Sequence, residues 1–261
     1  MGKRSTWSGA GAVALGLAGA GVAVDRRLGT TPVAAAAALT TAAAYLAGTF
    51  LPNARVFGAP VRTDVSADLF ALTFDDGPDP RHTLEISRVL AERGHRATFF
   101  VLGRAVRAHP RVAAAVVNDG HELACHGDDH RLLAFAPPSE LRRQMAANEH
   151  AVRDATGFLP EPFFRPPHGV RSPWLTRVVE QQGYHVCGWD GAVFDTAEPG
   201  VDAITERVVR ALRPGAILLL HDGDGSGRGA SRRQTVAALP AILDRAEERG
   251  LRSVTMSLLA A

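Results

Sequence analysis

From residue 68 to the end of the chain, short apolar runs alternate with longer segments whose apolar residues recur at helical spacing. Strands are expected at residues 68–74, 97–103, 121–126, 163–167, 184–190, 216–222 and 252–259. Helices are expected at residues 81–94, 105–120, 138–157, 172–183, 202–215 and 235–250, and each of these ends in glycine. Strands that each precede a helix form a parallel sheet covered by helices, which can close into a barrel. The predicted fold class is therefore α/β.

Two serines are expected to begin helices. Ser139 is predicted to cap the helix at 138–157, and Ser172, which precedes a proline, is predicted to cap the helix at 172–183.

Polar residues gather where the predicted strands end. They are Asp75, Asp76, His126, His130, Arg165, Asp190 and His221. In parallel α/β folds, ligands and catalytic groups lie at the carboxyl ends of the strands. The sequence therefore predicts a functional site at that edge.

The stretch LTFDDGPDP, residues 72–80, places two aspartates directly after an apolar run. Asp, Gly and Pro are common turn residues, so a polar turn is one interpretation. Adjacent carboxylates repel each other, and a partly buried one needs a partner. The other interpretation is therefore a metal-assisted site, in which one aspartate binds a cation and the other handles a proton.

The stretch HGDDH, residues 126–130, separates two histidines by four positions. In a helical turn both imidazoles would face one way, about 5–6 Å apart at Cβ. Such pairs are common on surfaces, so the spacing alone is weak evidence. A carboxylate from Asp75 or Asp76 would complete a His-His-Asp ligand set with open positions. The remaining aspartate would then stand beside a water acidified by the metal, as a general base.

Two further strand ends carry candidate catalytic groups. His221 ends the apolar run LLLHD, where it is either a structural histidine or a general acid that protonates a leaving group. Arg165 in FFRPPHG lies at a strand end, where its charge needs a carboxylate partner. An active-site aspartate is the expected partner.

In this order, TFDDGP, HGDDH, RPPHG and LLLHD resemble the motifs of the polysaccharide deacetylases, the NodB homology domain of carbohydrate esterase family 4. The resemblance covers about residues 68–259. It implies a distorted (β/α)7 barrel that removes acetyl groups from acetylated sugars with a bound divalent metal, usually Zn²⁺.

The resemblance also implies a role for each matching residue. Asp75 matches the general base, Arg165 the arginine that pairs with it, and His221 the general acid. The metal ligands would be Asp76, His126 and His130. Leu219 matches the apolar wall around the acetyl methyl group, and the backbone N–H of His168 matches part of the oxyanion hole.

Three positions depart from the family pattern. Gly127 replaces a usual Ser or Thr, which is expected to loosen the loop and weaken metal binding. His168 replaces a usual Tyr, which makes the sugar groove smaller and more polar. The motif Asp-x-x-Asp-Trp is hard to place, because residues 189–196 offer both Asp190 and Asp195; we favour Asp195 as the residue that orients His221.

The loop GDGSGRGASRR, residues 223–233, follows the expected acid. Its Gly- and Ser-rich composition suits either a segment that closes over substrate or a flexible connection.

The first 60 residues differ in composition from the rest. Residues 1–52 are predicted to anchor the chain in a membrane, residues 53–67 to form a linker, and residues 68–261 to form the catalytic domain. Residues 32–51 carry no charge over a length that spans a bilayer as helix. Residues 7–24 form a weaker second span or the core of a signal peptide. The basic residues do not fix the topology, and we expect an extracytoplasmic catalytic domain.

The charge composition argues against one class of binding partner. The 29 basic and 27 acidic residues nearly balance, and the basic residues are scattered, so nucleic acid is not an expected partner. Cys125 and Cys187 are expected to be small core residues.

The predicted function is metal-dependent removal of N-acetyl groups from amino sugars of a cell-envelope glycan or a lipid-linked saccharide. An O-acetyl esterase and a non-catalytic glycan-binding protein are the alternatives.

Overall fold

The computed structural model describes residues 32–58, 61, 63 and 67–261. The predicted second span or signal peptide at residues 7–24 lies outside the described residues. The chain divides into two compact units, Met1–Ala44 and Tyr45–Ala261. The larger unit therefore begins before the predicted linker at 53–67.

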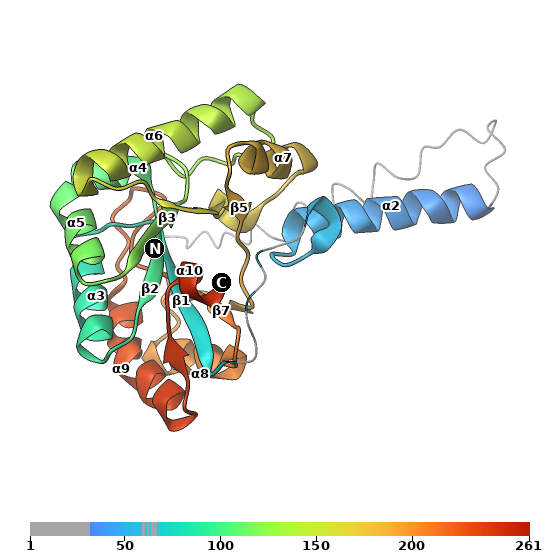
Figure 1. Cartoon of the computed structure of the whole chain (residues 1–261). Helices are drawn as coiled ribbons and strands as arrows, with labels where there is room; N and C mark the ends of the chain where they lie inside the picture. Colours follow the sequence, from blue (N-terminus) through green and yellow to red (C-terminus); the bar gives the residue numbers. More distant parts are fainter. Residues whose placement is uncertain (1–31, 59–60, 62, 64–66) are drawn as a thin grey trace, which may run out of the picture. The chain divides into compact units, whose positions relative to one another are not determined.

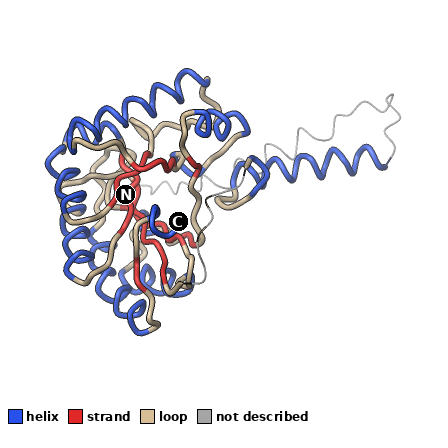
Figure 2. The backbone as a smooth tube through the Cα atoms, viewed as in Figure 1, coloured by secondary structure: helices blue, strands red, loops and turns tan. Residues whose placement is uncertain are grey.

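One parallel sheet organises the larger unit. Its strands are β1 (Leu69–Asp75), β2 (Ala97–Val101), β3 (Glu122–Cys125), β4 (Glu161–Phe164), β5 (His185–Val186), β6 (Gly191–Ala192), β7 (Ile217–His221) and β8 (Arg252–Ser253). The order is β5-β4-β3-β2-β1-β7-β6, and β8 pairs with the start of β1. The sheet curls, with the helices on its outside (Figure 1, Figure 2). Within the described residues β5 and β6 do not pair, so the predicted (β/α)7 barrel is an open half-barrel.

Helices cover the outer face of the sheet (Figure 2). They are α3 (Thr83–Glu92), α4 (Gly103–Ala108), α5 (Pro110–Asn118), α6 (Pro138–Thr156), α7 (Pro173–Gln181), α8 (Val201–Ala211) and α9 (Arg233–Glu248). The short α10 (Met256–Leu259) follows β8 and packs on the inner side, in the cluster that contains Ala71. Three 3₁₀ turns also occur: η1 (Arg55–Phe57), η2 (Pro167–Gly169) and η3 (Asp195–Ala197).

Several predicted elements need correction. The helix expected at 105–120 is two helices, because the residue before Pro110 leaves the helical conformation. The strand expected at 252–259 is short and gives way to α10, whose N-cap Thr255 accepts a hydrogen bond from the Leu258 N–H. Ser172 caps α7 as predicted, whereas α6 starts at Pro138 and leaves Ser139 inside it.

The alternation of side chains along β1 separates two cores. Phe70, Leu72 and Phe74 point outward into the large apolar cluster shared with the covering helices. Ala71 belongs to a different cluster, which includes Phe100 and Met256. Asp75 lies an even number of residues after Ala71, so its side chain is on the same face of β1. That face is the inner side of the curled sheet, where the site lies.

Helix α2 occupies Pro32–Phe50. None of the helices in the described part of the chain is both long enough and apolar enough to cross a membrane. The membrane-spanning helix predicted at residues 32–51 is therefore not supported.

Candidate active site

Most of the predicted site residues line one cavity of about 280 Å³. Its lining residues are Asp75, Asp76, His126, His130, His168, Gly169, Trp189, Thr196, Leu219 and His221. The remaining two, Arg165 and Asp195, are buried beside it, at 0% and 1% exposure. The sheet therefore brings together residues that lie up to 146 positions apart, from Asp75 to His221.

Asp76, His126 and His130 form the candidate metal centre. One ligand atom from each lies within 4.8 Å of the other two. Asp76 Oδ1 is 3.5 Å from His126 Nε2 and 3.1 Å from His130 Nε2. His126 Nδ1 lies 2.7 Å from the Arg165 carbonyl, which assigns its proton to Nδ1 and leaves Nε2 free to bind a metal.

The protonation state of His130 suits a divalent cation. Burial lowers the pKa of His130 to about 4, so its imidazole is neutral, as a metal ligand must be. Burial alone would raise the pKa of Asp76, but the neighbouring imidazoles of His126 and His130 lower it. Asp76 Oδ1 is buried, and no group in the described part of the chain donates a hydrogen bond to it, so a bound cation would satisfy this oxygen. The three residues therefore fit a metal such as Zn²⁺.

Asp75 is held by a buried arginine. Arg165 Nη1 donates to Asp75 Oδ1 over 2.7 Å and to Thr73 Oγ1 over 2.8 Å. Arg165 Nη2 donates to the Gly188 carbonyl over 3.1 Å, and the guanidinium lies 3.9 Å above the centre of the Phe100 ring. Asp75 compensates the buried charge, so the expected partner of Arg165 is present.

His221 is oriented by Asp195. The Asp195 carboxylate lies 2.8 Å from His221 Nδ1 and accepts from the His221 backbone N–H over 2.8 Å. Thr235 Oγ1 donates to the same carboxylate over 2.8 Å. Asp190 instead pairs with Arg213 at 3.0 Å, which resolves the alternative in favour of Asp195. Burial lowers the pKa of His221, but the charge and hydrogen bond of Asp195 outweigh it and raise that pKa to about 9.

His168 and Leu219 form further parts of the cavity wall. The imidazole of His168 meets that of His130 edge to face, with ring centres 4.4 Å apart. Asp76, His130 and His168 all have positive φ angles, of 79°, 62° and 62°. Non-glycine residues rarely adopt this conformation, and such strain concentrates at functional sites.

Two side chains of α6 hold the loop that carries His126 and His130. Gln144 from α6 accepts hydrogen bonds from the backbone N–H groups of Asp128 and Asp129, over 2.7 and 3.3 Å. Asn148, one turn further along α6, donates to the Gly127 carbonyl over 2.9 Å. These two buried amides anchor the loop from the side of α6.

Gly225 packs against the metal centre. A Cβ atom on Gly225 would lie 2.7 Å from Asp76 Oδ1 and 2.7 Å from the His130 ring, so only glycine fits there. Arg104 Nη2 donates to the Gly225 carbonyl over 2.6 Å. Gly225 is therefore packed against the ligands, whereas residues 226–229 of the same loop are exposed.

Four supporting residues escaped the sequence analysis. Gln144 and Asn148 lie four positions apart on the buried face of α6, and polar side chains on an otherwise apolar helical face are a usable signal. Thr235 and Gly225 follow the last catalytic motif and give no comparable signal, because their role depends on contacts across the sheet.

In sequence and fold, the chain is similar to known carbohydrate deacetylases. The sequence model of a family described as polysaccharide deacetylase matches residues 62–187. A chitooligosaccharide deacetylase from Sinorhizobium fredii is 36% identical over 194 residues, covering 72% of this chain and 90% of that protein. A peptidoglycan-N-acetylglucosamine deacetylase from Bacillus cereus is 35% identical over 198 residues, covering 73% of this chain and 87% of that protein. The crystal structure of a peptidoglycan N-acetylglucosamine deacetylase, in complex with 4-naphthalen-1-yl-N-oxidanyl-benzamide, superimposes with a TM-score of 0.72 at 28% identity, covering 77% of this chain and 91% of that chain.

Proposed function

The chain belongs to the polysaccharide deacetylase family, and from that premise we propose that it is a metal-dependent hydrolase that removes N-acetyl groups from amino-sugar units of a glycan. The observation that carries the proposal is the convergence of three units in one cavity: the ligand triad Asp76, His126 and His130, the Asp75–Arg165 pair, and the His221–Asp195 pair.

The residues divide the work of amide hydrolysis. A divalent metal, when bound by the ligand triad, lowers the pKa of water and polarises the acetyl carbonyl. Asp75 accepts the proton of the attacking water, and Arg165 keeps that carboxylate turned into the cavity. The backbone N–H of His168 is our proposed donor to the developing oxyanion.

His221 completes the reaction as the general acid. His221 gives its proton to the nitrogen of the departing sugar amine as the C–N bond breaks, so acetate and a free amine leave the site. Asp195 holds the ring of His221 and favours its protonated form. Leu219 lies at the cavity wall, where it would contact the acetyl methyl group.

For the substrate we propose N-acetylglucosamine units of a cell-envelope glycan, or of its lipid-linked precursor. The names of the two relatives support the sugar, since one acts on chitooligosaccharides and the other on peptidoglycan. A polymeric envelope substrate lies outside the cytoplasm, so we propose an extracytoplasmic location for the catalytic unit. Protease accessibility of the unit in intact cells tests that location.

The test of function is acetate release by the full chain. The chain is treated with a chelator, divided, and assayed with and without added Zn²⁺ on N-acetylglucosamine oligomers, isolated peptidoglycan and O-acetylated xylan. Release from the first two substrates only with metal is the expected result. Release from the xylan alone would indicate an esterase, and a chain that binds Zn²⁺ and oligomers without releasing acetate would indicate a binding protein.

A further inference from the structure

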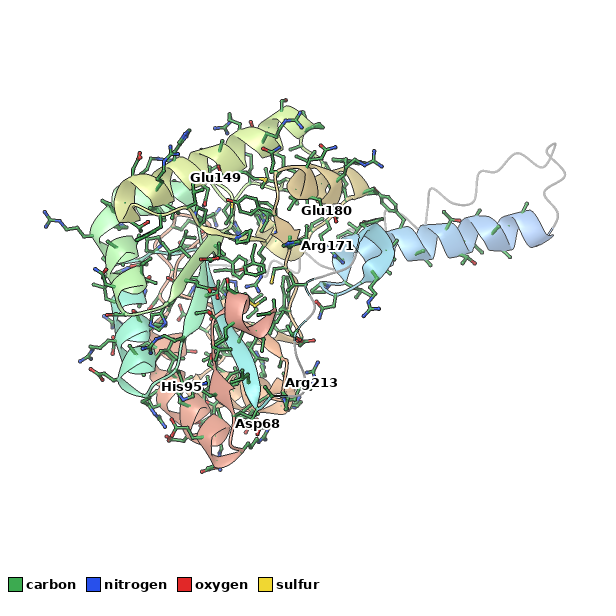
Figure 3. All side chains as sticks on the ribbon, viewed as in Figure 1. Asp68, His95, Glu149, Arg171, Glu180 and Arg213 are labelled. Carbon is green, nitrogen blue, oxygen red and sulfur yellow. The ribbon has the colours of Figure 1, made fainter. Side chains whose placement is uncertain are left out.

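The segment Tyr45–Gly58, which we term the docking segment, packs against the catalytic unit ahead of β1. Arg171, with 3% of its surface exposed, lies where this segment meets the unit (Figure 3). Its backbone N–H donates to the Thr49 carbonyl over 3.1 Å. Its Nη2 donates to the carbonyls of Leu51 and Ala54, over 2.7 and 2.9 Å. One buried side chain thus satisfies carbonyls around the end of α2.

The turn of the docking segment contacts residues 188–190. Asn53 Nδ2 donates to the Trp189 carbonyl over 2.9 Å and lies 3.2 Å from Asp190 Oδ1. The docking segment comes even closer to the backbone at Gly188. A Cβ atom there would lie 2.3 Å from both the Pro52 carbonyl oxygen and Asn53 Oδ1, so glycine is required for the two segments to meet.

Residues 188 and 189 also face the active site. The Gly188 carbonyl accepts from Arg165, the residue that holds Asp75. The Trp189 side chain lines the catalytic cavity, and its ring packs against Gly169, where a Cβ atom would lie 2.4 Å from the ring. The docking segment therefore touches, on one side, the same short stretch that forms the cavity wall on the other.

We propose that Asn53 is a positioning residue: it fixes the backbone of Gly188 and Trp189, and through them the indole wall of the cavity. The inference about substrate rests on the proposed function, whereas the inference about Trp189 does not. Loss of the Asn53 amide would release the Trp189 carbonyl and give the indole more freedom. Since the indole lies where the sugar would bind, KM should rise more than kcat falls.

The experiment uses the full chain with Trp7 and Trp174 replaced by Phe, which leaves Trp189 as the one tryptophan of three. Asn53→Ala removes the donor, and Asn53→Asp keeps the shape but places a carboxylate beside Asp190. Arg55→Ala is the matched control, because Arg55 is exposed in the same segment and makes no side-chain hydrogen bond within the described residues. Acrylamide quenching of Trp189 fluorescence, KM, kcat, metal content and Tm are measured for each.

Both Asn53 variants should increase quenching of Trp189 and raise KM on the order of tenfold, at unchanged metal content and with a similar Tm. Arg55→Ala should match the parent. Quenching that is unchanged in both Asn53 variants, or equally increased in Arg55→Ala, would overturn the proposal. If the parent released no acetate, the proposed function would fail, yet the quenching comparison would still decide the role of Asn53.

Discussion

Asp75 and Asp76 are neighbours in the chain, yet their carboxylates face different partners. Asp75 Oδ1 accepts a 2.7 Å hydrogen bond from Arg165, while Asp76 Oδ1 lies 3.1 Å from His130 Nε2. The positive φ of Asp76 turns the backbone between them and separates the two directions. The geometry therefore supports one aspartate as base and the other as ligand.

Asp75→Asn should abolish turnover and leave the metal bound. The amide keeps the shape but cannot accept the proton, so kcat should fall by about 10²–10⁴-fold. Acetate release and metal content of the purified variant are the measurements. Asp76→Asn is the paired variant and should lose metal as well as activity. If Asp75→Asn lost the metal and Asp76→Asn kept it, the roles of the two aspartates would be exchanged.

The pH dependence should follow His221. Its pKa is raised to about 9, so the ring holds the proton needed for the leaving group at neutral pH and loses it as pH rises. A bound cation repels that proton, so the alkaline limb of kcat/KM should lie below pH 9. In Asp195→Asn the favourable charge is gone, and the limb should shift to lower pH with a loss of about 10²-fold or more in kcat.

The His221–Asp195 pair should also make the stability of the folded protein depend on pH. Because the folded-state pKa of His221 lies above its ordinary value of 6.5, the stabilisation is fully present below pH 6.5 and is lost as pH rises through about 9. Thermal unfolding of the chelated protein between pH 6 and pH 9 should show a smaller decline in Asp195→Asn than in the parent. A parallel decline in both proteins would speak against the pair as the cause.

Gly225→Ala should weaken metal binding by at least about tenfold, because the new Cβ would press on Asp76 and the His130 ring. The backbone at Gly225 has no positive φ, so steric contact alone is tested. Competitive titration with a Zn²⁺ indicator measures the affinity. Arg228 lies in the same loop but is exposed, so Arg228→Ala should keep the parent affinity. A similar loss there would assign the effect to the loop as a whole.

Gln144→Ala should lower metal affinity about 10–100-fold without touching a ligand. The substitution leaves the N–H groups of Asp128 and Asp129 without their acceptor, so the loop between His126 and His130 should loosen. Zn²⁺ affinity and hydrogen exchange of residues 126–131 are the measurements. Gln181→Ala, on an exposed helix end, is the control and should change neither.

The sequence predicts the catalytic edge of the sheet better than it predicts the sheet's closure. Asp75, His126 and His221 each follow an apolar run, so parallel strands bring them to one edge whatever the curvature. Closure depends on whether β5 and β6 pair, and these strands have only two residues each. Nothing in a two-residue run distinguishes a strand from a connection.

What the sequence could not predict are contacts that depend on distance across the fold. Asp195 could be favoured over Asp190, but the reason became visible only with Thr235 and the His221 backbone beside it. Asn53 fell within a predicted linker, because polar residues and proline around it look like a connection. Its contact with Trp189 joins positions 136 residues apart, beyond the reach of any local pattern.

The position of β1 in the sheet has a consequence for synthesis on the ribosome. β1 lies between β2 and β7, and Thr73 on β1 donates to the Leu218 carbonyl, 145 residues later in the chain. While the chain is emerging, β2 can pair with one side of β1, but the other side stays an open strand edge until residue 221 has been made. Nascent or truncated chains that end before β7 therefore expose an apolar edge beside Asp75, and their expected fate is aggregation rather than partial activity.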